Sequence, residues 1–296
     1  MSASPASASG APAIEVSFTK VQGAGNDYLY LDGIAGPLPE DLPALARAMS
    51  ERHFGPGADG LIAIERGGRA PLRMRIWNAD GSEGRMCGNG MRGFAKLCYE
   101  RGYVPDGATA FDVETAAGLI RPTVLPEGGS VQRVEVDMGE PRFRRAQIPM
   151  EGPPGGECLD EPLEFGAEVV RVSAVSMGNP HAIIFVEDAE RAPVRVLGRR
   201  IEGDPLFPER VNVHFVQVAG PALLRVRSWE RGSGETLACG TGACASVVAA
   251  VRTGRAQRTA AVDVPGGRLD VDWGADNHVR LTGPTVRVYD GIYRPG

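Results

Sequence analysis

The strongest constraint on the fold of this 296-residue chain is an internal repeat. Shifting the sequence by 152 positions places residues 70–102 on residues 222–254, and ten of the 33 ungapped positions are identical. Average residue usage would give roughly two or three matches. The repeated stretches "LRMRIWNADGSEGRMCGNG" and "LRVRSWERGSGETLACGTG" each place one cysteine in a glycine-rich turn. The repeat predicts two related halves, each supplying one Cys-Gly turn.

The repeated unit has the pattern of a strand, a loop and a helix. "LRMRIW" and "LRVRSW" largely alternate apolar with polar residues, which is typical of a half-buried strand. The residues after each Cys-Gly turn have helical character and end at a glycine suited to a helix C-terminus. In the second copy nearly every residue from Ala243 to Val251 is apolar or small, so that helix must be buried on all sides.

Many short strand-like runs surround the two predicted helices. They favour an α+β fold of two pseudo-symmetric halves, each a curved, mostly antiparallel sheet or barrel around a central helix. Residues 1–13 are predicted to form a disordered tail and residues 14–132 the N-terminal half. Residues 133–280 are predicted to form the C-terminal half, with the last strands, 281–296, returning to the first.

Composition excludes several classes of protein. A net charge of -5 without a basic cluster argues against a nucleic-acid partner. No apolar run is long enough to cross a membrane, and the first residues lack the basic and apolar regions of a secretory signal. Five cysteines without CxxC spacing predict reduced thiols. We therefore expect a cytoplasmic protein without a membrane partner.

The two repeated cysteines, Cys87 and Cys239, are suited to proton transfer. Each precedes a predicted helix, whose dipole favours a thiolate and is expected to lower the thiol pKa by about one unit. The backbone N–H groups of the same turns can bind a carboxylate. Two halves facing each other would place a thiol on each side of a carbon next to that carboxylate. One thiolate would remove a proton from one face while the other thiol protonates the opposite face.

No cofactor or metal is expected. The chain has neither a P-loop nor a dinucleotide-binding fingerprint, and its cysteines and histidines lack the spacing of metal ligands. Packing or surface roles are predicted for the remaining candidates, which are Cys98, Cys158, Cys244, His53, His214 and His278.

The chain resembles the diaminopimelate epimerase family from about Phe18 to Tyr293. The resemblance rests on "GAGNDY", "FGPGADG", "WNADGSE", "CGNG", "SMGNPHA", "FPERVNVHF" and "ERGSGETLACGTGA", which occur in the family's order. It implies two pseudo-symmetric halves with the active site between them. It also implies interconversion of LL- and meso-2,6-diaminoheptanedioate without pyridoxal phosphate or metal, in lysine and peptidoglycan precursor synthesis. The expected partners are the amino-acid substrate and a second copy of the chain in a homodimer.

The resemblance also assigns roles to residues in the matching motifs. Cys87 and Cys239 would be the catalytic acid–base pair. His181 and Glu230 would modulate the pKa values of the thiols. The residues expected to bind substrate are Asn26, Asn78, Gly88, Asn89, Asn179, Asn212, Glu230, Arg231, Gly240 and Thr241, with Arg231 taking the distal carboxylate.

Two positions depart from the family pattern, and two other functions stay open. Gly60 stands where many relatives have glutamine, and Met91 stands where alanine is common. Proline racemases and hydroxyproline epimerases of the same fold also use paired cysteines, although they usually carry "CGHG" in the first turn. A dithiol redox sensor would instead need Cys87 and Cys239 to form a reversible disulfide.

Overall fold

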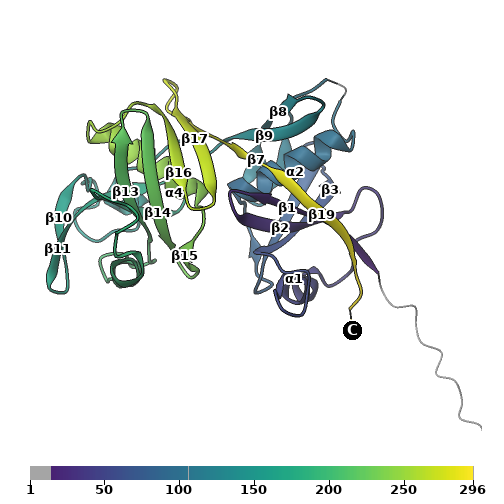
Figure 1. The fold of residues 1–296 in the computed structure, drawn as a ribbon, viewed down its shortest axis with the longest axis horizontal. Coiled ribbons are helices and arrows are strands. Elements are labelled where there is room, and N and C mark those ends of the chain that lie inside the picture. Colours follow the sequence, from purple (N-terminus) through teal and green to yellow (C-terminus); the bar gives the residue numbers. More distant parts are fainter. Residues whose placement is uncertain (1–14, 106, 296) are drawn as a thin grey trace, which may run out of the picture.

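The computed structural model describes residues 15–105 and 107–295 as two sheet-based halves (Figure 1). The predicted disordered tail, residues 1–13, lies outside the described residues. The α+β class with two pseudo-symmetric, mostly antiparallel halves is confirmed, and each sheet also contains two parallel strand pairs. Within the described part of the chain, no helix is long and apolar enough to span a bilayer.

The first half is an eight-stranded sheet with a helix on each face. Its strands are β1 (Val16–Gly23), β2 (Asn26–Asp32), β3 (Gly60–Arg66), β4 (Leu72–Asn78), β5 (Glu83–Gly84), β6 (Val113–Thr115), β7 (Gly118–Ile120) and β19 (Val286–Tyr293). Alternate residues of β2 and β3 pack toward α2 (Gly88–Glu100) and toward α1 (Leu42–Ser50), so these strands are apolar on both faces. Asp41 caps α1 by accepting the N–H of Ala44 at 2.9 Å.

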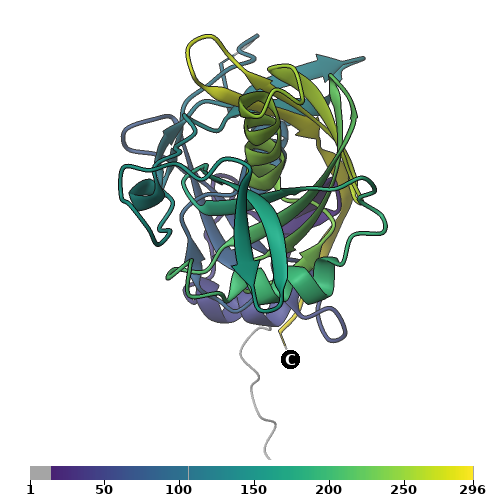
Figure 2. The ribbon, with the colours of Figure 1, turned by 90° about the vertical axis from the view of Figure 1, so that its left-hand side faces the viewer.

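The second half is an eleven-stranded sheet that curves around α4 (Gly240–Arg252), as Figure 2 shows. Its strands are β8 (Thr123–Glu127), β9 (Ser130–Asp137), β10 (Glu161–Phe165), β11 (Glu168–Ser176), β12 (Pro180–Phe185), β13 (Asn212–Gly220), β14 (Leu223–Glu230), β15 (Gly234–Thr236), β16 (Thr259–Val264), β17 (Gly267–Trp273) and β18 (Val279–Pro284). Short helical segments on its outer side are η1 (Arg145–Gln147), η2 (Val194–Gly198) and α3 (Arg199–Glu202).

The two halves repeat the same strand pairing around their central helices. In the first half β2 pairs parallel with β3, and β4 pairs parallel with β6 across α2. In the second half β12 pairs parallel with β13, and β14 pairs parallel with β16 across α4. Even the register repeats, because Trp77 lies opposite Glu83 on β4 and β5 while Trp229 lies opposite Glu235 on β14 and β15. The sequence repeat is therefore a structural repeat.

Two connections join the halves. β8 and β9 belong to the second sheet, although their hairpin packs on α2 of the first half. At the other end of the chain, β18 ends in the second sheet at Pro284 and β19 pairs with β1 in the first (Figure 1). The predicted domain boundary between residues 132 and 133 falls inside β9. Sheet membership alone would place the changeovers between Ile120 and Thr123 and between Pro284 and Val286.

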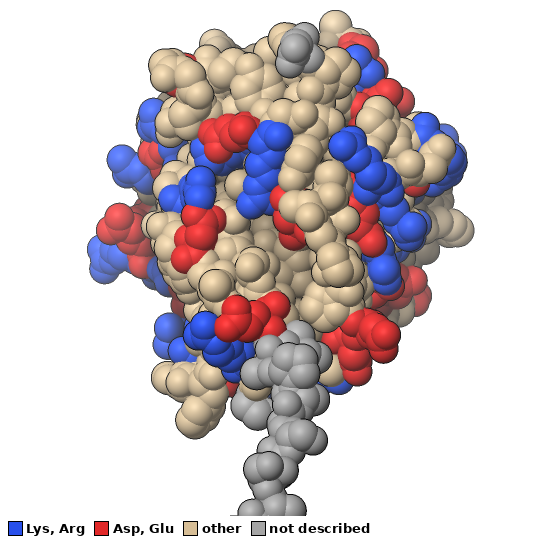
Figure 3. All heavy atoms as spheres, turned by 90° about the vertical axis from the view of Figure 1, so that its right-hand side faces the viewer, with Lys and Arg blue, Asp and Glu red and all other residues tan. Residues whose placement is uncertain are grey.

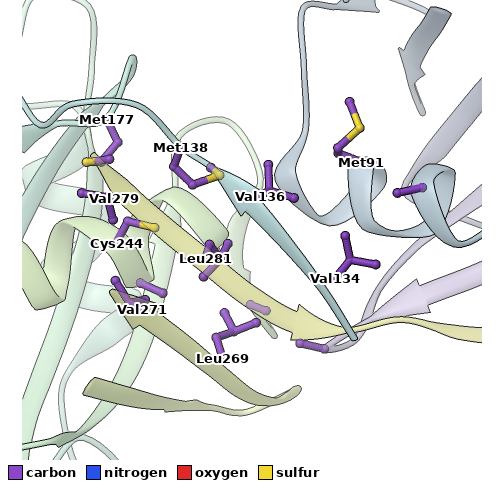
Figure 4. Packing of buried hydrophobic residues seen from close by; sticks show 14 of the residues in the cluster. Met91, Val134, Val136, Met138, Met177, Cys244, Leu269, Val271, Val279 and Leu281 are labelled. Atoms are coloured by element: carbon purple, nitrogen blue, oxygen red, sulfur yellow. The ribbon is translucent and has the colours of Figure 1, made fainter. Parts of the chain in front are cut away.

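One hydrophobic core runs through both halves. It includes Met91 and Phe94 of α2 and continues through Met138 and Leu281 to Cys244 of α4 (Figure 4). Met91 is fully buried in this junction, where it supports the first turn of α2. Burying one core between the two helices fixes their relative positions, because close-packed interiors deform little.

The outer face of the first half carries charged side chains of both signs. Acidic and basic side chains are interspersed on the side drawn in Figure 3. Such a surface lacks the continuous positive charge that attracts nucleic-acid phosphates.

Candidate active site

Cys87 and Cys239 occupy equivalent positions at the N-termini of the two central helices. Cys87 is the residue before α2, and its Sγ accepts the backbone N–H of Gly90 at 3.4 Å. Cys239 is the residue before α4. Both thiols therefore lie where helix dipoles and unpaired backbone N–H groups favour negative charge.

The two helix N-termini converge at the junction of the halves. A Cβ at Gly88 would meet the Leu281 side chain at 4.0 Å, and one at Gly240 would meet it at 3.1 Å. The same position at Gly240 lies 3.6 Å from Asn89 Oδ1 of the other turn. The negative charge of Asp59, in the first half, also contributes to raising the pKa of Glu230 in the second, after the larger effect of burial. The structure thus brings both Cys-Gly turns to one place.

On the first side, a polar cluster surrounds Cys87. Asn26 Nδ2 donates to Asp59 Oδ2 at 2.6 Å, and Asn26 Oδ1 lies 3.9 Å from Cys87 Sγ. Tyr28 and Tyr30 are buried beneath them. Burial raises the pKa of both phenols well above the ordinary value, and the charge of a Cys87 thiolate raises it further. Asp59 and Tyr28 were not among the sequence-predicted site residues, although both lie inside the quoted motifs "FGPGADG" and "GAGNDY".

On the second side, Cys239 is held between a hydroxyl and a carboxyl group. Its Sγ lies 3.6 Å from Thr241 Oγ1. Burial raises the pKa of Cys239 well above its ordinary value, Glu230 raises it further, and Thr241 lowers it. The expectation of a lowered pKa is therefore wrong for Cys239, because loss of hydration outweighs the helix dipole. Burial likewise raises the pKa of Glu230, whose Oε1 accepts from Thr236 Oγ1 at 2.6 Å.

The remaining predicted binding residues differ in how they are placed. Asn212 is buried with its amide already engaged, since Nδ2 donates to Pro180 O at 3.0 Å and Oδ1 accepts the Arg231 N–H at 3.0 Å. It therefore orients the backbone of Arg231. The Arg231 side chain is exposed and donates to Glu209 O at 2.8 Å. Asn78 is exposed, and its Nδ2 donates to Ser82 Oγ at 3.0 Å within a turn.

A departure from the family pattern also has a structural correlate. A Cβ at Gly60 would lie 2.3 Å from the backbone oxygen of Trp77 and 3.0 Å from the Tyr28 ring. Any side chain at this position would require β3 and β4 to move apart.

His181 and His214 form a buried pair behind Asn179. His181 Nε2 lies 2.9 Å from Asn179 Oδ1, and His181 Nδ1 lies 2.9 Å from His214 Nε2. The sequence predicts only a packing or surface role for His214. Both side chains are fully buried, and burial lowers the pKa of His181 well below its ordinary value and that of His214 to about 3. Both imidazoles are therefore neutral at physiological pH.

The buried histidine pair predicts acid sensitivity of the fold. Both pKa values are depressed in the native state, so below about pH 6.5 the unfolded chain binds protons that the native chain does not. Above that pH the two histidines contribute a constant amount to the free energy of unfolding. Below it the free energy of unfolding decreases by about 1.4 kcal/mol per pH unit for each imidazole. Urea unfolding between pH 7 and pH 5 measures the slope. The slope should become about 1.4 kcal/mol per unit shallower in His214→Ile, and identical slopes would contradict the prediction.

The site offers two thiols, two carboxyl groups and several amides. Among the described residues, no group of three or more His, Cys, Asp or Glu side chains is placed to hold a metal ion. The arrangement suits the transfer of protons to and from a carbon held between the two helix N-termini.

Comparison with known proteins finds relatives over nearly the whole chain. The family model described as "Diaminopimelate epimerase" matches residues 18–144 and 173–288. The chain is 50% identical over 277 residues to diaminopimelate epimerase of Moorella thermoacetica, covering 93% of this chain and 98% of the relative. It is also 50% identical over 279 residues to that of Geobacillus thermodenitrificans, covering 93% and 96%.

Solved structures show the same fold at low sequence identity. A hydroxyproline epimerase from Agrobacterium vitis matches with a TM-score of 0.66 and 16% identity, over 95% of this chain and 92% of that one. A phenazine biosynthesis protein of the PhzF family from Bacillus anthracis matches with a TM-score of 0.67 and 15% identity, over 95% and 100%.

Proposed function

The chain belongs to the diaminopimelate epimerase family, and on this premise we propose that Cys87 and Cys239 are its catalytic acid–base pair. It is an isomerase that interconverts LL- and meso-2,6-diaminoheptanedioate, an amino acid of lysine biosynthesis. The observation that carries the assignment of residues is the convergence of two repeat-related helix N-termini, each preceded by a thiol.

The proposed reaction is a proton transfer on each face of the α-carbon. A thiolate on one face takes the α-proton, and the electron pair of the broken C–H bond moves onto the α-carboxylate. The thiol on the other face then gives its proton to the carbon, which inverts the centre and exchanges the protonation states of the two sulfurs. Each sulfur is therefore the proton donor in one direction of the reaction and the proton acceptor in the other.

The other residues would bind the substrate and stabilise the developing charge. Backbone N–H groups of Gly88, Asn89, Gly240 and Thr241 would hold the reacting carboxylate, which gains negative charge during the transfer. Asn26, Asn78 and Asn179 would bind polar groups of the substrate. Asn212 would act through the backbone of Arg231, and His181 and Glu230 would adjust the thiol pKa values.

Deuterium incorporation tests the proposed chemistry. LL-diaminoheptanedioate incubated with the purified, reduced protein in deuterated water should give meso product labelled at one α-carbon, as measured by mass spectrometry and proton NMR. The label arises because the donating thiol exchanges its proton with solvent before it protonates the carbon. Formation of unlabelled meso product would reject the two-thiol mechanism, and comparable turnover of proline would favour the racemase alternative.

We predict that Arg231→Met weakens substrate binding far more than it slows turnover. A charge-assisted hydrogen bond to the distal carboxylate is worth about 1.5–3 kcal/mol, which corresponds to a KM raised by about 10- to 100-fold. Steady-state kinetics separate the two parameters. Arg225→Met is the matched control, because Arg225 is an exposed arginine at the opposite end of β14. A fall in kcat with an unchanged KM would contradict the assignment.

We also propose that residues 14–132 with 281–296 and residues 133–280 are the two domains, and that the protein is a homodimer. Four exposed apolar side chains on β19 support a contact between copies, namely Val286, Val288, Tyr289 and Ile292. β19 is also the end strand of the first sheet's order. Sedimentation equilibrium should give twice the chain mass for the wild type and a monomer for Val288→Asp. A wild-type monomer would reject the proposal.

A further inference from the structure

The second half contains a buried polar pair where the first half is apolar. Ile62 on β3 lies opposite Ile76 on β4, under the first turn of α2. The equivalent residues, 152 positions later, are His214 on β13 and Ser228 on β14, which also lie opposite each other. Since an apolar pair packs under this helix in the first half, folding alone does not require the polar pair in the second.

A chain of hydrogen bonds connects this polar pair to His181. Ser228 Oγ lies 2.8 Å from His214 Nδ1, and His214 Nε2 lies 2.9 Å from His181 Nδ1. The three side chains come from the adjacent strands β14, β13 and β12, and all three are buried. Each imidazole is neutral and carries a single N–H, so the position of one proton determines the next.

The other end of this hydrogen-bonded chain reaches the sulfur of Cys239. Asn179 Oδ1 faces His181 Nε2 at 2.9 Å, and Asn179 Nδ2 donates to Thr241 Oγ1 at 3.3 Å. Because a carbonyl oxygen only accepts, His181 carries its proton on Nε2. Because the Thr241 oxygen accepts from Asn179, its own hydroxyl proton is available to Cys239 Sγ, 3.6 Å away.

These constraints fix the donor-to-acceptor direction of every hydrogen bond in the series. With Nε2 of His181 protonated, its Nδ1 must accept from Nε2 of His214. Nδ1 of His214 must then accept the hydroxyl proton of Ser228. Every donor therefore points toward Cys239. The reverse arrangement would turn the Asn179 amide over and direct the Thr241 proton away from the sulfur.

We propose that His214 and Ser228 are positioning residues for Cys239, which set the direction of this chain so that Thr241 donates its hydroxyl proton to the sulfur. The proposal rests on the proposed role of Cys239 in proton transfer. A hydrogen bond donated to the sulfur favours the thiolate, and Thr241 indeed lowers the pKa of Cys239 against the opposing effects of burial and Glu230. The hydrogen-bonded chain therefore helps the buried Cys239 thiol to lose its proton.

Nitrogen-15 NMR of histidine-labelled protein tests the direction itself. His181 and His214 should both appear as neutral Nε2–H tautomers from pH 7 to pH 5, with assignment from His214→Ile and His181→Gln. Nδ1–H tautomers would correspond to the reverse chain and would overturn the proposal, as would protonation of either ring at pH 6.

An isosteric pair at Ser228 tests the consequence for the thiol. Ser228→Thr keeps the hydroxyl group, whereas Ser228→Val removes it at nearly the same volume. In a Cys87→Ala background, the pH dependence of Cys239 alkylation by iodoacetamide should shift upward in Ser228→Val by about half a unit to one unit. Alkylation below the pKa would then be about three- to tenfold slower. Ser228→Thr should keep the profile of the Cys87→Ala parent.

The two possible failures can be told apart. Two charged groups act on the hydrogen-bonded chain, Glu230 on Cys239 and Arg231 on His181, and both are present in every variant. Identical alkylation profiles for folded Ser228→Val and Ser228→Thr would overturn the role of the chain while leaving the acid–base pair intact. Full epimerase activity in Cys239→Ala would instead overturn the proposed function.

Discussion

Cys87→Ala and Cys239→Ala should each lose nearly all epimerase activity. One remaining thiol can exchange a proton on only one face of the α-carbon, so inversion lacks either its base or its acid. A positioned general acid or base contributes about 10²- to 10⁴-fold, and we expect kcat to fall by at least this factor in each variant. Conversion of LL substrate to meso product, followed by chiral chromatography, measures the loss. Substrate binding measured by calorimetry should persist, because the backbone N–H groups of both helix turns remain.

Cys158→Ala provides the control for cysteine replacement. Cys158 is buried in the outer core of the second half, and burial raises its pKa to about 12, so it is an inert thiol at neutral pH. Its replacement should leave kcat within about twofold of the wild type. Activity retained in either Cys87→Ala or Cys239→Ala would contradict the assignment of the pair.

The paired turns and the fold could be predicted from the sequence because the repeated segment contains the Cys-Gly turn together with the strand and helix patterns around it. Seven of the ten identities lie on β4, β5 and α2, and the strand register of β4 with β5 repeats in β14 with β15. Local alternation and helix patterns are sufficient for such elements, since they depend on nearby residues. The sequence could therefore predict two cysteines at helix N-termini.

The sheet changeover at β8 and β9 was not predictable in this way. The boundary expected at residues 132 and 133 cuts β9, whose partner β18 lies more than a hundred residues away in the chain. Strand alternation shows that a segment is a strand but does not identify its partner. The partner is determined by long-range packing, here of the β8–β9 hairpin on α2.

The role proposed for His214 could not be predicted from the sequence for a different reason. A histidine within an apolar strand pattern is usually a packing residue, and His214 has no local motif that distinguishes it. The signal was present in the mismatches of the repeat, where His214 and Ser228 replace Ile62 and Ile76. The identities in an internal repeat identify the shared scaffold, whereas buried apolar-to-polar differences identify what one half does alone.

Comparing the two halves also predicts that Gly242→Ala lowers the free energy of unfolding much more than Gly90→Ala does. A Cβ at Gly242 would lie 2.1 Å from Cε1 of His214, whose ring is held by hydrogen bonds on both sides. A Cβ at Gly90 would meet Cδ1 of Ile62 at 2.6 Å, the far end of a flexible side chain, and its next neighbour, Cβ of Cys87, would lie at 3.5 Å. Overpacking costs about 1–3 kcal/mol, and each disrupted buried hydrogen bond adds about 1–3 kcal/mol.

We therefore expect Gly242→Ala to lose about 3–5 kcal/mol of unfolding free energy in urea, and Gly90→Ala about 1–2 kcal/mol. Gly203→Ala is the control, because its nearest neighbouring atom would be 3.9 Å away. Combining Gly242→Ala with His214→Ile should recover part of the stability, since an isoleucine end can yield as it does at Ile62. A Gly242→Ala protein as stable as Gly203→Ala would show that the imidazole is free to move. The directional chain to Cys239 would then lack the rigid anchor that its geometry requires.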